Sequence, residues 1–451
     1  MLGSLIWTCV IPLAAGGSMP AGQAITLDEA IQLGLARNPS LAALRSELDI
    51  TKAAAAEARA QRWPRLTAEA ALRGTDNQVM VFGDKLTAGE FASGDFALGQ
   101  LNDPDPIRHG VAAVGLDFPL YTSGRIRSGI AAADFESGAA FARLRGGESD
   151  LIMMITETYY GIDLARAAAQ VSEAAVSDAR SHEAVAAARH ESGAALRSDL
   201  LRAQVLRMSR ERDLDRKKAD VELARARLRR LLASGPHETL EPASGLTPPE
   251  AGLGDLDQWL AYALASRPEI EDARQRSKAA HAGAQSARAF LGPELSALAR
   301  YERNTNSLDF GEGSYLVGVS LRWAVFDHGR AARISAAEAR QEAAGYAARA
   351  VENTVLLEVE QAYRDAVVAA GSMTVAREAV SAAEEARRIT AERYQAGLLP
   401  IADLLDVETE LTRARMAEIS ARYDAVVGPA RLERAVGGPP NGSPGDTGAT
   451  Q

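Results

Sequence analysis

The residues of this 451-residue chain that could perform chemistry are its histidines and carboxylates, and their spacing favours no reaction. His182 and Glu183 begin the zinc pattern HExxH, but no histidine follows three residues later. The sequence also lacks the phosphate-binding GxxxxGK[ST] and the GxSxG of serine hydrolases. We therefore predict no catalytic residue, no cofactor and no metal site, in a protein that is not an enzyme.

The carboxylates follow a helical pattern. Most alternate with arginine, which is typical of solvated helix faces carrying i,i+4 pairs. Asp403 and Asp406 differ, because they are three residues apart and share one face of a predicted helix without a neighbouring arginine between them. From the residues alone, the expected role of Asp403 is to cap the start of its helix.

Composition favours long helices that pack closely. Hydrophobic residues make up 47% of the chain and aromatic residues only 5%, and alanine supplies much of the apolar total. Alanine favours helix and allows close approach of neighbouring helices. The net charge of -10 argues against a nucleic-acid-binding protein, which would show a basic face.

An internal duplication organises the chain. We predict a first repeat at 25–233, a linker rich in Gly, Pro and Ser at 234–254, a second repeat at 255–436 and a disordered tail at 437–451. The anchors that recur in the same order are Leu27-Asp28 with Leu256-Asp257, Pro39 with Pro268, Pro64 with Pro293, Gly124-Arg125 with Gly329-Arg330, and Gly193 and Asp199-Leu200 with Gly397 and Asp403-Leu404.

The sequence predicts the same order of helices and strands in both repeats. A helix of about 35 residues (near 28–62 and 257–290) is followed by two β segments and then by a helix of about 65 residues without proline. A glycine-containing turn and another helix of about 35 residues complete each repeat. Because a helix rises 1.5 Å per residue, the longest ones reach about 100 Å, which indicates a coiled-coil assembly or a tube.

The β segments alternate between apolar and polar residues, as strands between lipid and water do. The residues that we predict to face lipid are Leu116, Phe118, Val319, Leu321 and Trp323. Four strands cannot close a barrel, which needs about eight, so the strands would have to pair across copies, and three copies would supply twelve. The alternative is an ordinary half-buried sheet.

The first 24 residues resemble a secretory signal, with an apolar run from Leu5 to Ala15 and small residues at Gly22 and Ala24. This run is too short for a transmembrane helix. The only cysteine, Cys9, lies within it, so cleavage after Ala24 would leave a mature chain without thiols or disulfides.

Over about residues 25–436 the chain resembles the TolC-type outer membrane efflux proteins. The most specific stretches run from Tyr394 to Asp406 and from Phe326 to Arg330. The resemblance implies a homotrimer in the outer membrane, mainly α-helical with transmembrane β-strands. Four strands per chain would build a 12-stranded barrel that continues into a long periplasmic α-helical barrel. It also implies a periplasmic adaptor and an inner-membrane pump of the RND or ABC type as partners.

The resemblance also assigns roles to the turns at 192–198 and 396–402, which would form the periplasmic tip. The residues that would dock the adaptor are Gly193, Leu196, Gly397, Leu398, Leu399 and Pro400. Asp403, Asp406 and Asp199 would line the periplasmic aperture, where a trimer would focus negative potential. The first repeat carries Arg202 at the position of Asp406, so the two hairpins are not equivalent.

Two further expectations concern the loop and the cargo. The segment 74–110 is about two dozen residues longer than its counterpart near 303–313, and we expect it outside the cell, either as a plain surface loop or as a partial lid.

The predicted function is passive efflux of small molecules. The alternatives are type I protein secretion and, from a different class, a non-membrane coiled-coil scaffold, which fractionation would separate because a scaffold is soluble without detergent.

Overall fold

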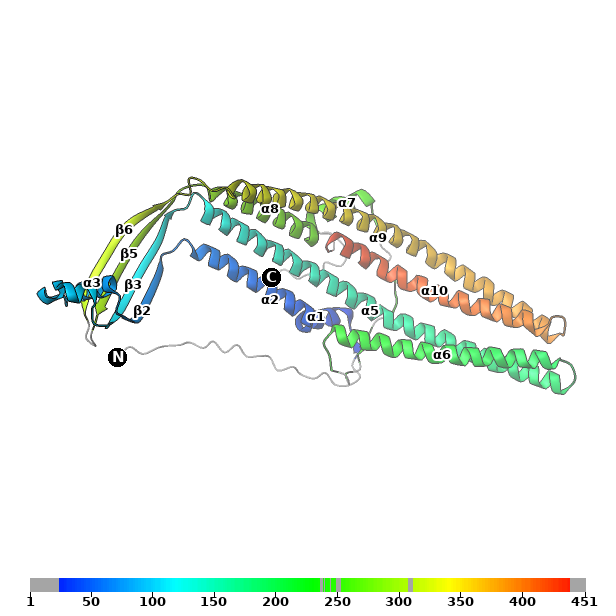
Figure 1. The fold of residues 1–451 in the computed structure, drawn as a ribbon. Coiled ribbons are helices and arrows are strands. Elements are labelled where there is room, and N and C mark those ends of the chain that lie inside the picture. The colour runs from blue at the N-terminus through cyan, green and yellow to red at the C-terminus, as the bar shows by residue number, and fades with distance from the viewer. Residues whose placement is uncertain are drawn as a thin grey trace. The chain divides into compact units, whose positions relative to one another are not determined.

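The chain is mainly helical and contains one four-stranded sheet, as the computed structural model shows (Figure 1). The structure describes residues 24–235, 238, 240–243, 245–248, 253–306 and 311–438. All of the predicted signal segment except Ala24, Cys9 included, and nearly all of the predicted tail lie outside the described residues, and so does part of the predicted linker. None of the helices searched in this part of the chain is both long and apolar enough to cross a membrane.

The two repeats fold into the same series of elements. The first repeat contains α1 (Leu27–Arg37), α2 (Pro39–Ala60), β2 (Arg65–Thr75), β3 (Ile107–Tyr121), α5 (Arg125–Glu191) and α6 (Arg197–Leu231). The second contains α7 (Leu256–Ser266), α8 (Pro268–Ala289), β5 (Glu294–Thr305), β6 (Glu312–Arg322), α9 (Arg330–Gln395) and α10 (Ile401–Val436). Matching helices have 11 and 11, 22 and 22, 67 and 66, and 35 and 36 residues. Both repeats therefore have the same order and nearly the same lengths of helices.

The helix that opens each repeat is broken, so the prediction of one helix of about 35 residues was wrong. Asn38 and Arg267 separate the two pieces and have extended backbones, with ψ of 124° and 120°. Each precedes a proline, whose ring disfavours the helical conformation in the residue before it. Pro39 and Pro268 then start the next helix, where the missing N–H is harmless.

The sheet is antiparallel throughout and has the order β2-β3-β5-β6, so β2 and β6 form its edges. Its register places Leu66 opposite Leu116, and Leu116 opposite Ala299. Trp323 was predicted to belong to the last strand, but β6 ends at Arg322. The indole Nε1 of Trp323 instead donates a hydrogen bond to the Leu291 carbonyl oxygen (3.1 Å).

Two short features complete the chain. The predicted loop between β2 and β3 contains three helical turns or helices: α3 (Gln78–Thr87), the 3-10 helix η1 (Ser93–Phe96) and α4 (Leu98–Asn102). In the linker, β4 (Glu241–Pro242) pairs in parallel with β1 (Ala24–Ile25), which begins at the last residue of the predicted signal segment.

The described residues form two compact units, each taking segments from both repeats. The sheet unit comprises 44–144 and 268–353 and contains all four strands. The hairpin unit comprises the described residues of 1–43, 145–267 and 354–451 and contains the turns α5–α6 and α9–α10. In its core the hydroxyl of Tyr159 donates to the Ile25 carbonyl oxygen (2.9 Å). Gly34 leaves room for Ile155, whose Cδ1 lies 2.4 Å from where a β-carbon would stand.

Candidate functional site

The turns at the ends of the two long hairpins have the same backbone structure. Gly193 and Gly397 have positive φ (73° and 76°), and each N–H bonds back to the carbonyl three residues earlier. The next residue, Ala194 or Leu398, bonds to the carbonyl five residues earlier (2.7 and 2.9 Å). This is the Schellman motif, which a β-carbon at the glycine position would strain. Both glycines are therefore required by the turn itself.

The apolar residues of the turns differ in exposure. Leu196 and Leu398 are 71% and 73% exposed. Leu399 is half-buried, and Pro400 is exposed and occupies the N-cap position of α10. The predicted docking residues therefore lie at the two turns, with one large leucine exposed in each.

The three predicted aperture aspartates lie close behind these turns. Asp199 and Asp403 are the third residues of α6 and α10, and both stand in the first helical turn, where the helix dipole stabilises a carboxylate by about 0.3–1 kcal/mol. Asp403 does not cap its helix, because the N-cap residue is Pro400. Asp403 and Asp406 are both exposed, on the side of α10 away from the buried Leu404.

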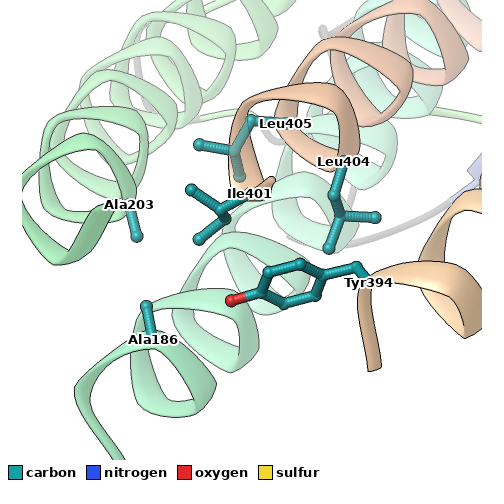
Figure 2. Packing of buried hydrophobic residues seen from close by; sticks show 6 residues of the cluster. All are labelled: Ala186, Ala203, Tyr394, Ile401, Leu404 and Leu405. Carbon is teal, nitrogen blue, oxygen red and sulfur yellow. The ribbon is translucent and has the colours of Figure 1, made fainter. Parts of the chain in front are cut away.

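A small apolar cluster joins the two hairpins just behind the turns (Figure 2). In Figure 2 the side chains from α10 and the ring of Tyr394 from α9 converge, facing alanines on α5 and α6. The cluster consists of Ala186, Ala203, Tyr394, Ile401, Leu404 and Leu405. Full burial of an isoleucine or leucine contributes about 1.5–3 kcal/mol, so this cluster is a main link between the hairpins.

A cation at the end of α5 strengthens this link. The guanidinium of Arg189 donates to the carbonyl oxygens of Tyr394 (2.9 Å) and Gln395 (2.7 Å), the last residues of α9. Its central carbon also lies 4.5 Å from the centre of the Tyr394 ring. A cation that bonds the final carbonyls of a helix satisfies groups that lack partners within the helix. Arg393 stands at the equivalent position of the second hairpin, four residues before Gly397, but it is exposed, so the two hairpins differ here.

A buried carboxylate further along α10 binds two other helices. Glu408 Oε1 accepts hydrogen bonds from Nε2 of His182 on α5 (2.9 Å) and from Nε of Arg387 on α9 (2.8 Å). Burial raises the pKa of the Glu408 carboxyl, but the hydrogen bonds from His182 and Arg387 outweigh it and leave the pKa below its ordinary value. The neighbouring Thr409 hydroxyl accepts from Arg210 of α6 (2.9 Å), so all four long helices meet here. No local sequence pattern predicts this cluster, because its members are far apart in the sequence.

The sheet has one apolar and one polar face, as its alternation predicted. The register places Phe118, Ala297 and Val319 side by side on the apolar face. Leu116, Val319 and Leu321 are exposed there and Phe118 is half-buried. On the opposite face, Nη1 of Arg300 lies 3.2 Å from Oε2 of Glu69. A continuous exposed apolar surface of this kind indicates contact with lipid or with another protein.

The histidines and carboxylates of these surfaces do not gather into a metal site among the described residues. Within the part of the chain that the structure describes, no group of three or more His, Cys, Asp or Glu side chains is placed to hold a metal ion. His182 and Glu183, the pair that resembles half of a zinc motif, have separate partners, since Glu183 binds Nε of Arg207.

Comparison with known proteins matches both repeats of the chain to one protein family. A family profile described as outer membrane efflux protein matches residues 30–234 and 259–438. The protein CyaE of Bordetella pertussis is 33% identical over 180 residues, covering 39% of this chain and 38% of CyaE, so the chain matches less than half of that relative. The outer membrane efflux protein BepC of Brucella suis is 25% identical over 333 residues, which is 73% of this chain and 72% of BepC. The outer membrane protein VceC of Vibrio cholerae has a similar fold (TM-score 0.78, 21% identity), over 91% of this chain and 96% of VceC.

Proposed function

Because this chain belongs to the outer membrane efflux protein family, a family of non-enzymatic outer-membrane channels, we propose that it is the passive outer-membrane conduit of a three-part export system for small molecules. The conduit would receive its cargo from an inner-membrane pump through a periplasmic adaptor. The observation that carries this proposal is that one chain combines a sheet that has an exposed apolar face with two helical hairpins. The longer helices of these hairpins have 67 and 66 residues, and the hairpin turns carry exposed leucines.

The sheet supports a trimeric barrel. Its four strands are too few to close, and β2 and β6 are left as edges. Because the strands alternate in direction and their number is even, β6 of one copy and β2 of the next run antiparallel. Three copies would continue the observed pattern into a closed ring of twelve strands with the apolar face toward lipid.

The hairpin tips support a periplasmic docking and aperture site. Exposed Leu196 and Leu398 supply apolar contacts for an adaptor, which fits the enrichment of large apolar residues in interface centres. In a trimer, three copies of Asp403 and Asp406 would surround one axis and attract cations. The backbone at both turns is fixed by the glycine motif, so the tip presents these side chains on a defined surface.

Crosslinking from the tip tests this function. Leu398→Cys is introduced into a chain whose native Cys9 is replaced by serine, and intact cells are treated with a thiol-reactive photocrosslinker. Val375→Cys is the matched control, since Val375 is a similarly exposed apolar residue on α9 away from the turn. The proposal expects the tip cysteine, and not the control, to capture a periplasmic adaptor that mass spectrometry identifies.

The same experiment separates the alternatives. An adaptor whose co-purifying pump is proton-driven supports small-molecule efflux, whereas one that co-purifies with an ATP-driven exporter and a secreted polypeptide supports protein secretion. Capture of cytoplasmic proteins only, from a chain that stays soluble without detergent, would overturn the channel function and leave the coiled-coil scaffold.

A further inference from the structure

The segment between β2 and β3, residues 76–106, is a folded insertion rather than an open loop. Its helix α3 is capped by Asn77, whose side chain accepts from the Met80 N–H (3.2 Å). The Lys85 ammonium binds Oδ1 of Asp95 (2.8 Å) and ties α3 to η1. Three aromatic rings, Phe82, Phe91 and Phe96, stack edge to face with centroids 4.6 and 5.1 Å apart. These contacts hold the parts of the insertion together.

One side of α3 is fixed to the sheet by a buried polar cluster. Asp84 is 4% exposed, and its carboxylate accepts from Nε of Arg73 on β2 (3.3 Å). The imidazole of His109 on β3 is 1% exposed and lies between Asn304 Oδ1 (3.2 Å) and Asn306 Oδ1 (2.8 Å). Moving α3 away from the sheet would leave the buried Asp84 carboxylate without its arginine partner, which disfavours that movement.

This cluster lies on the polar face of the sheet. Arg73 and His109 are cross-strand partners, and side chains two residues apart along a strand share a face. Arg73 and Glu69 are four residues apart on β2, so both lie on the same face of the sheet. This is the polar face, where Glu69 pairs with Arg300. Figure 1 shows α3 at the ends of the strands that the insertion connects. The insertion thus covers the face opposite to Leu116 and Val319.

The other side of α3 is apolar and uncovered. Val79 and Leu86 are 81% and 59% exposed, and Phe82 between them is 36% exposed. Their spacing of three and four residues places them on one helix face, which we call the α3 stripe. The connection in the second repeat is too short for a ten-residue helix, because six residues separate the end of β5 at Thr305 from the start of β6 at Glu312.

We infer that the insertion narrows the outer mouth of the channel, and that the α3 stripe packs against the same stripe in the other two copies. This inference rests on the proposed trimeric barrel, in which the polar face of the sheet lines the lumen. The stripe cannot reach lipid, because α3 stands on the face opposite to the lipid-facing one. Threefold symmetry instead brings three equivalent stripes toward one axis, where burying Val79, Phe82 and Leu86 against their copies removes them from water.

The test places one cysteine on the stripe, Val79→Cys, in a chain with Cys9→Ser. Oxidation in intact cells should link two of the three chains into a disulfide-bonded dimer on a denaturing gel. Leu72→Cys is the matched control, because Leu72 is 78% exposed at a similar level of the sheet but on the apolar face. In the barrel its copies would lie a third of the circumference apart and stay unlinked.

A second variant measures the constriction. Residues 78–104 are replaced by a short Gly-Ser connection, and Ser320→Cys on the polar face of β6 reports access from outside. In intact cells a bulky, membrane-impermeant maleimide should label Ser320→Cys several-fold faster without the insertion, while a small maleimide shows less change. Equal rates for the bulky reagent would show that the insertion does not restrict the mouth.

The mass of the detergent-purified protein shows whether a negative crosslinking result contradicts only the inference or also the proposed function. A trimer whose Val79→Cys stripes do not link overturns the inference and leaves the proposed function intact. A protein that is not a trimer contradicts the proposed function itself. Linkage of Val79→Cys but not Leu72→Cys within a trimer supports the inference even if the deletion variant fails to fold.

Discussion

The hairpins α5–α6 and α9–α10 have the same turn and nearly the same length, but their helices use their apolar residues differently. After the second turn, Leu404 and Leu405 are buried in the cluster that joins the hairpins. At the equivalent position to Leu405 in the first hairpin, Leu201 is 50% exposed, and Val205 and Met208 continue an exposed apolar stripe along α6. The two hairpins thus share the backbone motif but not the burial of their side chains: α10 stabilises the chain internally, whereas α6 leaves apolar side chains exposed.

The largest difference between the hairpins should appear when their leucines are truncated. Leu404 is 1% exposed, so Leu404→Ala should lower the free energy of unfolding by about 2–5 kcal/mol. Leu201→Ala, on the exposed face, should change it by about 0.5 kcal/mol or less. Denaturant unfolding of the detergent-solubilised chain, followed by helical circular dichroism, measures both. A large loss for Leu201→Ala would mean that another copy buries this face.

Glu408 provides the next test, because the equivalent position of the first hairpin is Gln204 and carries no charge. Glu408→Gln should lower the free energy of unfolding by about 1–3 kcal/mol at pH 7, since His182 and Arg387 lose their carboxylate. Glu410→Gln, at an exposed position, is the control.

The pH dependence of that loss has a defined sign. The folded pKa of Glu408 lies below its ordinary value of 4.5, so its stabilisation is fully present above pH 4.5 and disappears as the pH falls through the folded pKa. Thermal melts of the two proteins should therefore converge on acidification. A gap that widens with acid would contradict the assigned hydrogen bonds.

A smaller effect is expected from the paired arginines at the turns. Arg189→Ala should cost about 1–2 kcal/mol, because it removes two hydrogen bonds to α9 carbonyls and the contact with the Tyr394 ring. Arg393→Ala, at the matching exposed position, should stay within about 0.5 kcal/mol of the unchanged protein. Thermal unfolding compares them, and equal losses would remove the asymmetry between the hairpins.

The smallest effect on stability is expected at the aperture aspartates. Asp403→Ser with Asp406→Ser removes a favourable first-turn charge and should cost below about 1 kcal/mol. In planar bilayers the same double variant should lose cation preference and become less sensitive to multivalent cations. Asp199→Ser should alter selectivity less, because Arg202 stands where the first hairpin would carry its second aspartate. Unchanged selectivity in the double variant would leave Asp403 with the helix-start role alone.

The sequence was most informative where a feature is local and repeated. The long helices, the glycine turns and the alternation of the strands could be predicted because each depends on nearby residues and occurs twice. The helix break before Pro39 and Pro268 is also a local and repeated feature. It could have been predicted, because the residue before a proline disfavours the helical conformation.

Contacts between distant segments could not be predicted. Arg189 and Tyr394, or His182 and Glu408, are separated by about two hundred residues, and only the packed helices bring them together. The strand boundary at Trp323 and the folding of α3 were missed for a related reason. Alternation continues past the last ladder bond, and the anchor of α3 is a single aspartate whose partners lie on two strands.

The pairing of β3 with β5 also constrains how the molecule can be made. It aligns Gly110 with Thr305, so the sheet stays incomplete until both repeats have been synthesised. The first repeat alone supplies only the hairpin β2–β3, and an isolated two-stranded hairpin is marginally stable in water. Non-local strand pairing of this kind is slow and leaves strands and apolar side chains open to aggregation meanwhile. The four-stranded sheet can therefore form only once both repeats are available, and until then the β3 edge of the first hairpin is open to pairing with other chains.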